Sequence, residues 1–177
     1  MTATTVKSVQ VTKHAARPVD LVSPGVLGGV KRHAQGVIEA ATTSLDEIGD
    51  IIRMIRLPAN VKLTALRLWS DDLDSDSALR VDIGLYKVNA DETITVLDAD
   101  CFATAVDATP VTGGATGGLD VLNEVLNIDQ RGLPLWDMAA GVTADPGVPV
   151  EICLTVSTAG TSADAGTIVM EAEFTAD

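Results

Sequence analysis

The stretch ALRVDIGLYKV, residues 78–88, alternates apolar and polar side chains over most of its length. A period of two is the pattern of a β-strand with one buried and one exposed face. The buried face is expected to carry Leu79, Val81, Ile83 and Leu85, and the exposed face Arg80, Asp82 and Tyr86. The stretch therefore predicts a half-buried strand, and the segments around it extend the prediction.

Further strand candidates lie on both sides of this stretch. They are residues 36–41 (GVIEAA), 49–58, 61–69, 94–97, 148–156 and 167–174. Turn-forming Gly, Pro, Asp and Ser separate them, and a short helix is expected only in LPLWDMAA, residues 133–140. Seven or eight short strands without a long amphipathic helix predict an all-β fold, an antiparallel β-sandwich. The spacing of the strands favours a jelly-roll-like arrangement.

Residues 34–177 are expected to form a single β-sandwich domain, and residues 1–33 an extended N-terminal arm. The arm shows no steady period and contains Pro18, Pro24 and several glycines. In the whole chain of 177 residues, 46% are hydrophobic but only 3% are aromatic, which predicts an aliphatic core. Cys101 and Cys153 form neither a disulfide framework nor a zinc motif, so we interpret them as reduced, buried side chains.

The formal net charge is −13, and it is distributed unevenly. Residues 1–33 carry +4, residues 34–67 carry 0 and residues 68–177 carry −17. An acidic body repels nucleic acid and anionic membranes, so neither is an expected partner. No apolar run approaches the roughly 20 residues that span a bilayer, and the first thirty residues lack the pattern of a signal peptide. Synthesis in the cytoplasm follows as an expectation.

The densest group of carboxylates is DDLDSDSALRVD, residues 71–82. Counted from Asp72, the first three ligand positions of a helix–loop–helix calcium site hold Asp72, Asp74 and Asp76. Position 6 is Ser77 instead of Gly, and position 12 is Ile83 instead of Glu. We therefore favour a solvated hairpin loop between strands 61–69 and 78–88. A looser metal site at these three aspartates remains the alternative.

No catalytic arrangement stands out in the sequence. The two histidines, His14 and His33, both lie in the expected arm, where a group is poorly positioned for acid–base catalysis. No nucleophile elbow, HExxH or CxxC pattern is present. The glycine-rich GGATGG, residues 113–118, lacks the GK[ST] of a phosphate-binding loop. These features predict a protein that is not an enzyme and needs no cofactor.

The arm combines basic and apolar residues, which suits docking on an acidic protein surface. Its candidate contact residues are Lys7, Val9, Val11, Lys13, Arg17, Val19, Leu21, Lys31 and Arg32. No aromatic residue lies between the basic ones, so a stacking platform for single-stranded nucleic acid is not expected. Outside the arm, Trp69 and Trp136 are large side chains that can serve either as core residues or as interface anchors.

Several blocks of the chain resemble tailed-bacteriophage and prophage virion structural proteins of the capsid decoration (cement) type. They are IGDIIRMIRLPAN (48–60), SALRVDIGLYK (77–87), DADCFATAVD (98–107), LPLWDMAAGVTADPGVPVEICLTVSTA (133–159) and AGTIVMEAEF (165–174). The resemblance covers roughly residues 35–175 and fits the arm less distinctly. Because these are structural patterns, they point to a phage virion β-protein more specifically than to its exact role.

The resemblance implies a capsid decoration protein that clamps neighbouring major capsid subunits and stabilises the head. It further implies a homo-oligomer, with a trimer favoured, on the capsid surface of the virion after synthesis in the host cytoplasm. The alternative is a β-sandwich binding module of the tail, neck or fibres that acts as an adhesin or binds carbohydrate. That alternative would require exposed aromatic rings, and Trp69, Tyr86 and Trp136 are the only Trp and Tyr residues of the chain.

Overall fold

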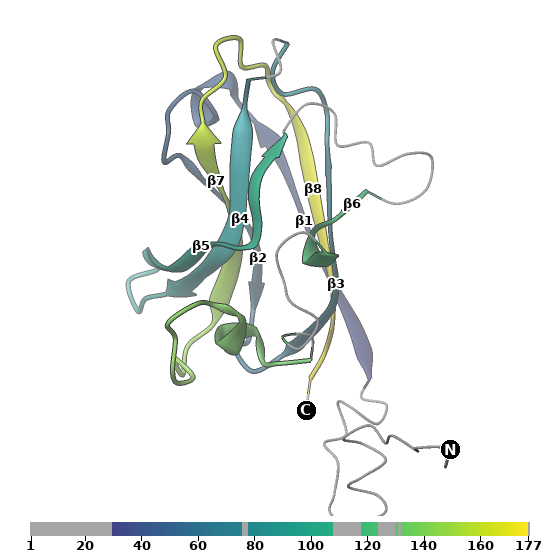
Figure 1. Cartoon of the computed structure of the whole chain (residues 1–177), viewed down its shortest axis with the longest axis vertical. Coiled ribbons are helices and arrows are strands. Elements are labelled where there is room, and N and C mark those ends of the chain that lie inside the picture. Colours follow the sequence, from purple (N-terminus) through teal and green to yellow (C-terminus); the bar gives the residue numbers. More distant parts are fainter. Residues whose placement is uncertain (1–29, 76–77, 108–117, 124–129, 131, 177) are drawn as a thin grey trace, which may run out of the picture.

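The computed structural model describes residues 30–75, 78–107, 118–123, 130 and 132–176. Within them, two four-stranded antiparallel sheets face each other (Figure 1), which confirms the predicted all-β sandwich. The strands are β1 (Lys31–Ala40), β2 (Ile51–Leu57), β3 (Lys62–Ser70), β4 (Arg80–Val88), β5 (Ile94–Asp107), β6 (Leu119–Asp120), β7 (Val150–Thr158) and β8 (Gly166–Thr175). The described connections contain short 3-10 helices at Thr42–Ser44 (η1), Val121–Asn123 (η3) and Leu135–Met138 (η4).

Each sheet takes strands from both halves of the chain. The first sheet has the order β1-β8-β3-β6, and the second has the order β2-β7-β4-β5. Among the described strands, β4 and β5 are the only successive pair that are neighbours in one sheet, and every other successive pair is divided between the two sheets. This order fits the expected jelly-roll-like arrangement, in which strands distant in sequence pair with each other.

The space between the sheets is filled by aliphatic side chains. The largest fully buried ones are almost all Leu and Ile, accompanied by Met170 and by Phe102, the one aromatic residue among them. In β8 buried and half-buried residues alternate along most of the strand, as the sequence pattern predicts for a strand with one face on the core. Leu79, Val81, Ile83 and Leu85 are buried as expected.

The other face of β4 differs from the expectation of a solvated surface, because Tyr86 is only 3% exposed. Ile83 pairs with Ala103 and Leu85 pairs with Asp98, so a short step along β4 corresponds to a much longer step along β5. This irregular part of β5 lies against Gly84, where a Cβ would be 2.2 Å from the carbonyl oxygen of Asp98. Gly84 therefore permits a close approach of β5, and the outer face of β4 is partly covered.

The first sheet begins within the range that was expected to be the arm. Lys31, Arg32 and His33 belong to β1 and pair with Thr175, Phe174 and Glu173 of β8. The remaining arm candidates (Lys7, Val9, Val11, Lys13, Arg17, Val19 and Leu21) lie outside the described residues, as do Asp76 and residues 113–117 of the glycine-rich loop. Figure 1 shows that β1 begins and β8 ends at the same end of the sandwich.

A buried carboxylate fastens the edge strand β2 to β7 on the outer face of the second sheet. Both oxygens of Glu151 accept hydrogen bonds from Arg53, at 2.6 and 2.9 Å, and Oε1 also accepts one from Arg56 at 2.7 Å. Arg56 donates a further bond to Glu92, in the turn between β4 and β5. The side chain of Glu151 is only 6% exposed. The two arginines thus neutralise a buried charge and join three segments of the chain.

We predict that Glu151→Gln lowers the free energy of unfolding by about 1–3 kcal/mol, because the arginines lose a charged acceptor. Glu171→Gln, on the outer face of the first sheet, is the matched control and should change stability by less than about 0.5 kcal/mol. Urea denaturation of both variants at neutral pH measures the difference. Equal effects of the two substitutions would contradict the assigned role of Glu151.

The same carboxylate makes stability depend on pH. Burial alone would raise the pKa of Glu151, but the bonds from Arg53 and Arg56 outweigh it, and the pKa lies below its ordinary value. The stabilisation is therefore complete above the ordinary glutamate pKa of about 4.3, and it is lost as the pH falls through the lower pKa of the folded state. In Glu151→Gln this part of the acid-induced loss of stability should disappear.

Candidate interaction surface

The acidic segment after β3 is not a hairpin loop, which corrects the interpretation favoured from the sequence. β3 belongs to the first sheet and β4 to the second, so residues 71–79 cross from one sheet to the other. Both segments were correctly predicted to be strands, but the sequence pattern of a strand does not specify whether two successive strands pair. The described part of the crossing is held by backbone bonds to the segment before β8, including that from Asp164 N–H to the Leu73 carbonyl at 2.8 Å.

Asp74 is the organising residue of this crossing. It is fully buried, and its Oδ2 accepts hydrogen bonds from the backbone N–H groups of Ala78 and Leu79, each at 2.7 Å. Asp74 also forms an isolated antiparallel bridge with Ala163. An aspartate that bonds nearby backbone N–H groups stabilises a turn in the same way as a helix cap. The carboxylate thus fixes the start of β4.

The three metal candidates differ in their placement. Asp72 is exposed, Asp74 is buried and engaged by backbone N–H groups, and Asp76 lies outside the described residues. Within the described ranges, no group of three or more His, Cys, Asp or Glu side chains is arranged to hold a metal ion. The two described aspartates are not brought together as a pair of inward-facing ligands. The contacts of Asp72 and Asp74 are hydrogen bonds from backbone N–H groups of the crossing, so these residues stabilise its local structure.

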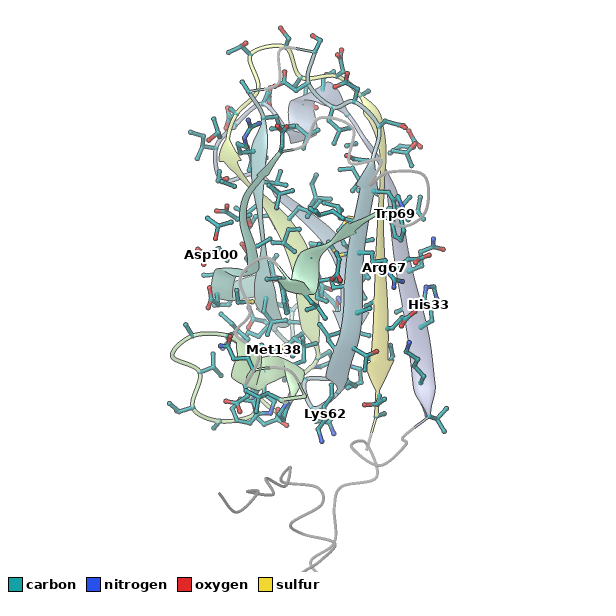
Figure 2. All side chains as sticks on the ribbon, turned by 45° about the vertical axis from the view of Figure 1, so that its right-hand side comes forward. His33, Lys62, Arg67, Trp69, Asp100 and Met138 are labelled. Atoms are coloured by element: carbon teal, nitrogen blue, oxygen red, sulfur yellow. The ribbon has the colours of Figure 1, made fainter. Side chains whose placement is uncertain are left out.

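Charged side chains on β1, β8 and β3 share the outer face of the first sheet. Lys31 forms an ion pair with Glu173, which Arg67 also approaches, at 3.6 Å. Glu171 lies beside His33 at 3.6 Å and accepts a hydrogen bond from Gln35 at 3.5 Å. Figure 2 shows His33, Arg67 and Trp69 on this side of the molecule. Since the basic side chains are exposed and the carboxylates are only half-buried, the pairs add little stability and leave a polar surface suited to contact with a partner.

An apolar row crosses the same face above these charges. Val37 of β1 lies opposite Val169 of β8, which in turn lies opposite Trp69 of β3. Val37 is 61% exposed, whereas Val169 and Trp69 are half-buried. A Cβ on Gly118 would contact the Trp69 ring, so the backbone before β6 packs directly on the indole. Trp69 is therefore neither a fully buried core residue nor a free aromatic platform.

Exposed apolar side chains concentrate at one edge of the sandwich. Of the large hydrophobic residues that are exposed in the described part of the chain, four lie in β1, the β1–β2 connection and the start of β2: Val37, Ile38, Ile48 and Ile51. β1 and β2 are the edge strands of the two sheets on this side. Sequence reasoning missed this set, although the run GVIEAA has no polar alternation around Val37 and Ile38 that would have indicated a solvated strand. We call these four residues the β1–β2 edge.

The other aromatic residues do not form a sugar-stacking surface with Trp69. The Tyr86 ring is buried, and its hydroxyl shares a hydrogen bond with Thr155 at 2.6 Å. Trp136 belongs to η4 and packs against the core, and its backbone N–H donates to the Ala59 carbonyl at 3.1 Å. The three side chains come from different parts of the fold and present no common platform. Their placement counts against the carbohydrate-binding alternative.

The cysteines are unsuited to nucleophilic chemistry. Both are free and buried. Burial raises the pKa of the Cys153 thiol to about 12 and holds the pKa of the Cys101 thiol well above its ordinary value. The reactive thiolate is therefore scarce at neutral pH. Both side chains serve as small buried hydrophobes, as their scattered positions in the sequence predicted.

An open pocket of about 340 Å³ lies between the β2–β3 turn and the segment before β7. Its lining is mainly apolar and backbone in character, with two polar side chains: Pro58, Ala59, Asn60, Asp145, Gly147, Val148 and Pro149. Its described lining includes one carboxylate, that of Asp145, and no histidine or cysteine. Among the described helices, none is long and apolar enough to cross a membrane.

No protein-family model and no curated protein matches the chain. Solved structures do share its fold. A chain of the cyanophage Pam1 capsid asymmetric unit superimposes with a TM-score of 0.54 at 16% identity, over 92% of this chain and 96% of that chain. A chain of the capsid of Ralstonia phage GP4 gives a TM-score of 0.54 at 19% identity, over 84% of this chain and 86% of that chain. At these identities the likeness establishes a shared fold.

The contacts of Asp74 generate a test of its role. We predict that Asp74→Ala lowers the free energy of unfolding by about 2 kcal/mol, because two backbone N–H groups lose their acceptor. Asp164→Ala, an exposed aspartate of the facing segment, should change it by less than about 0.5 kcal/mol. Urea denaturation with and without millimolar calcium measures both effects. A stabilisation by calcium that disappears in Asp74→Ala would instead establish a metal site.

Proposed function

We propose that this protein is a structural component of a phage virion, and specifically a capsid decoration (cement) protein. The observation that carries the proposal is the fold likeness to a chain of a phage capsid over almost the full length of both chains. The sequence blocks that resemble phage virion proteins support the same class independently. The described side chains add to this support, because the most buried carboxylates, Asp74 and Glu151, serve the fold.

In this proposal the sandwich is a rigid body and the N-terminal segment is the attachment device. Residues 1–29 precede β1 and contain three basic residues, Lys7, Lys13 and Arg17, with Val9, Val11, Val19 and Leu21 among the apolar ones. An extended segment of this kind binds by adding backbone hydrogen bonds to a strand edge and burying alternate side chains. Its partner is the major capsid protein, and its place is the outer surface of the capsid.

The distribution of charge suits such an attachment. The segment from residue 68 to the C-terminus carries −17, whereas residues 1–33 carry +4. The basic part is attracted to acidic patches on a capsid, while the acidic body keeps neighbouring copies soluble and separate. Association into a trimer, as the family resemblance implies, would give each particle-bound unit three arms. Several weak contacts then act together, and the retention of the protein rises by avidity.

Stabilisation of the head follows from this geometry. A unit whose arms lie across the boundary of two capsid subunits resists their separation, because the boundary opens only if the arms are stripped off. The proposed role requires no catalysis, cofactor or nucleic acid. Assembly takes place in the host cytoplasm, where the chain is synthesised, and the final location is the virion.

The arm gives the direct test. Deleting residues 2–29 leaves all of β1 in place, since β1 begins at Lys31, and we predict an unchanged thermal transition of the sandwich. Binding to particles that lack the protein should fall at least tenfold, because each lost 1.4 kcal/mol of contact weakens binding tenfold. Co-sedimentation with purified particles measures the occupancy.

A matched variant separates charge from apolar contact. Changing Lys7, Lys13 and Arg17 to Gln keeps the length and the apolar residues, and it should weaken binding mainly at low salt. Full occupancy after the deletion would contradict the arm as the attachment device. If neither the deleted nor the intact chain binds particles, the decoration role itself is wrong.

A further inference from the structure

We propose that strand β1 pairs with β1 of a second copy of this chain. The two strands run antiparallel around a two-fold axis at Gln35, and they join the two first sheets into one continuous sheet. This inference goes beyond the capsid proposal and does not depend on it, because it concerns the purified protein alone. Two observations support it: the outer edge of β1 has no neighbouring strand among the described residues, and the charged side chains of Lys31 and Glu39 in β1 are placed symmetrically about Gln35.

β1 is the most regular open edge among the described strands. Its ten residues pair with β8 from Lys31 to Ala40 without a register shift, and it has no neighbour on its other side in the first sheet. The other edges are less suitable: β6 has two residues, and the pairings of β2 and β5 contain irregularities. A long regular edge presents unpaired N–H and C=O groups that favour an added strand.

The sequence of β1, KRHAQGVIEA, lacks the devices that usually block such an edge in its middle. It contains no proline, and its basic residues stand at one end only. Val37 is 61% exposed and Ile38 is 37% exposed, although both belong to a strand of the first sheet. Figure 2 shows β1 at the margin of the sandwich, with no described strand beyond it. An added strand would cover these two apolar side chains.

The charges of β1 are complementary to themselves in an antiparallel pair. With Gln35 opposite Gln35 of the second copy, Lys31 lies opposite Glu39 of the second copy, and the reverse pair forms at the other end. His33 then lies opposite Val37 of the second copy. All these side chains are on the outer face, where opposite charges directly across a strand pair are favourable. A single register thus forms two ion pairs and covers the exposed valine on each copy.

The existing contacts of these residues are compatible with the pairing. Lys31 already meets Glu173, and Glu39 accepts a bond from the Thr167 hydroxyl at 2.6 Å. An ammonium has three donors and a carboxylate accepts several bonds, so each can contact a second partner. Although each copy carries −13, residues 31–40 contain two basic residues and one acidic residue, so the contact lies on one of the least acidic parts of the chain.

The symmetric placement of Lys31 and Glu39 favours a second copy of β1 as the strand that binds this edge. A capsid segment or the arm of a neighbouring copy could also add to an open edge, but neither requires Lys31 and Glu39 to be spaced symmetrically about Gln35. A two-fold pair is isologous, because each copy contributes the same surface. It is distinct from a three-fold contact, so a trimer formed through other surfaces could still be linked to a neighbour through β1.

Site-directed cross-linking tests the register. In the full-length chain, Gln35→Cys places two cysteines directly opposite each other, at a Cα separation that permits a disulfide. Mild oxidation should convert most of the protein into disulfide-linked pairs. Val37→Cys is the matched control, because it lies on the same strand and face but opposite His33 of the second copy. The native cysteines are buried and should not contribute.

Charge exchange tests the ion pairs. Lys31→Glu and Glu39→Lys should each weaken self-association about tenfold by sedimentation velocity, because like charges then face each other at both ends. Mixing the two variants should restore association, since one copy is then acidic and the other basic at both positions. Circular dichroism confirms that each variant folds, because Lys31 also contacts Glu173 within its own chain.

Three results would overturn the proposal. One is a cross-linking yield for the Gln35→Cys variant no higher than that for the Val37→Cys variant. Another is association of the wild-type chain that is insensitive to both charge reversals, which would assign it to another surface. The third is a wild-type chain that stays monomeric at millimolar concentration, which would leave the β1 edge for an arm or a capsid segment.

Discussion

Burial of the aliphatic inner faces of the two sheets is the interaction on which the rest of the structure depends. The chain has few aromatic residues, so Leu, Ile and Val from strands throughout the sequence must fill the core together. Since each sheet combines strands from both halves of the chain, neither half can bury its apolar face alone. The polar contacts outside the core have a secondary role. They fix the crossings and edges that this interleaved order creates.

Two buried carboxylates illustrate that role. Asp74 bonds the backbone where the chain passes from the first sheet to the second, and Glu151 joins β2 to β7 through two arginines. An unpaired charge in either place would be costly, and both are stabilised by fixed donors. Asp74 belongs to the acidic segment that suggested a metal site in the sequence, and its observed hydrogen bonds, like those of Glu151, stabilise the fold. Within the described residues, the β1–β2 edge and the outer face of the first sheet offer surfaces to partners.

The sequence predicted the strands well and their partners poorly. The alternation in residues 78–88 identified the inward face of β4 because period two follows directly from strand geometry. It did not reveal that Tyr86 is buried on the other face or that β5 approaches Gly84 closely, since the sequence pattern does not show the irregular pairing of β4 with β5. The acidic crossing was interpreted as a hairpin for the same reason. Asp74 could not be distinguished from Asp72 because burial is decided by the segment around Ala163, far along the chain.

The central claim is that this chain decorates a capsid, and the copy number in purified particles tests it most directly. Quantitative mass spectrometry gives the ratio of this protein to the major capsid protein of the same particle. For a decoration protein we predict a ratio near one or a simple fraction of it, which corresponds to hundreds of copies spread over the shell. A handful to a few dozen copies would contradict decoration and place the protein in the tail, neck or fibres. Absence from the particle would contradict a virion role altogether.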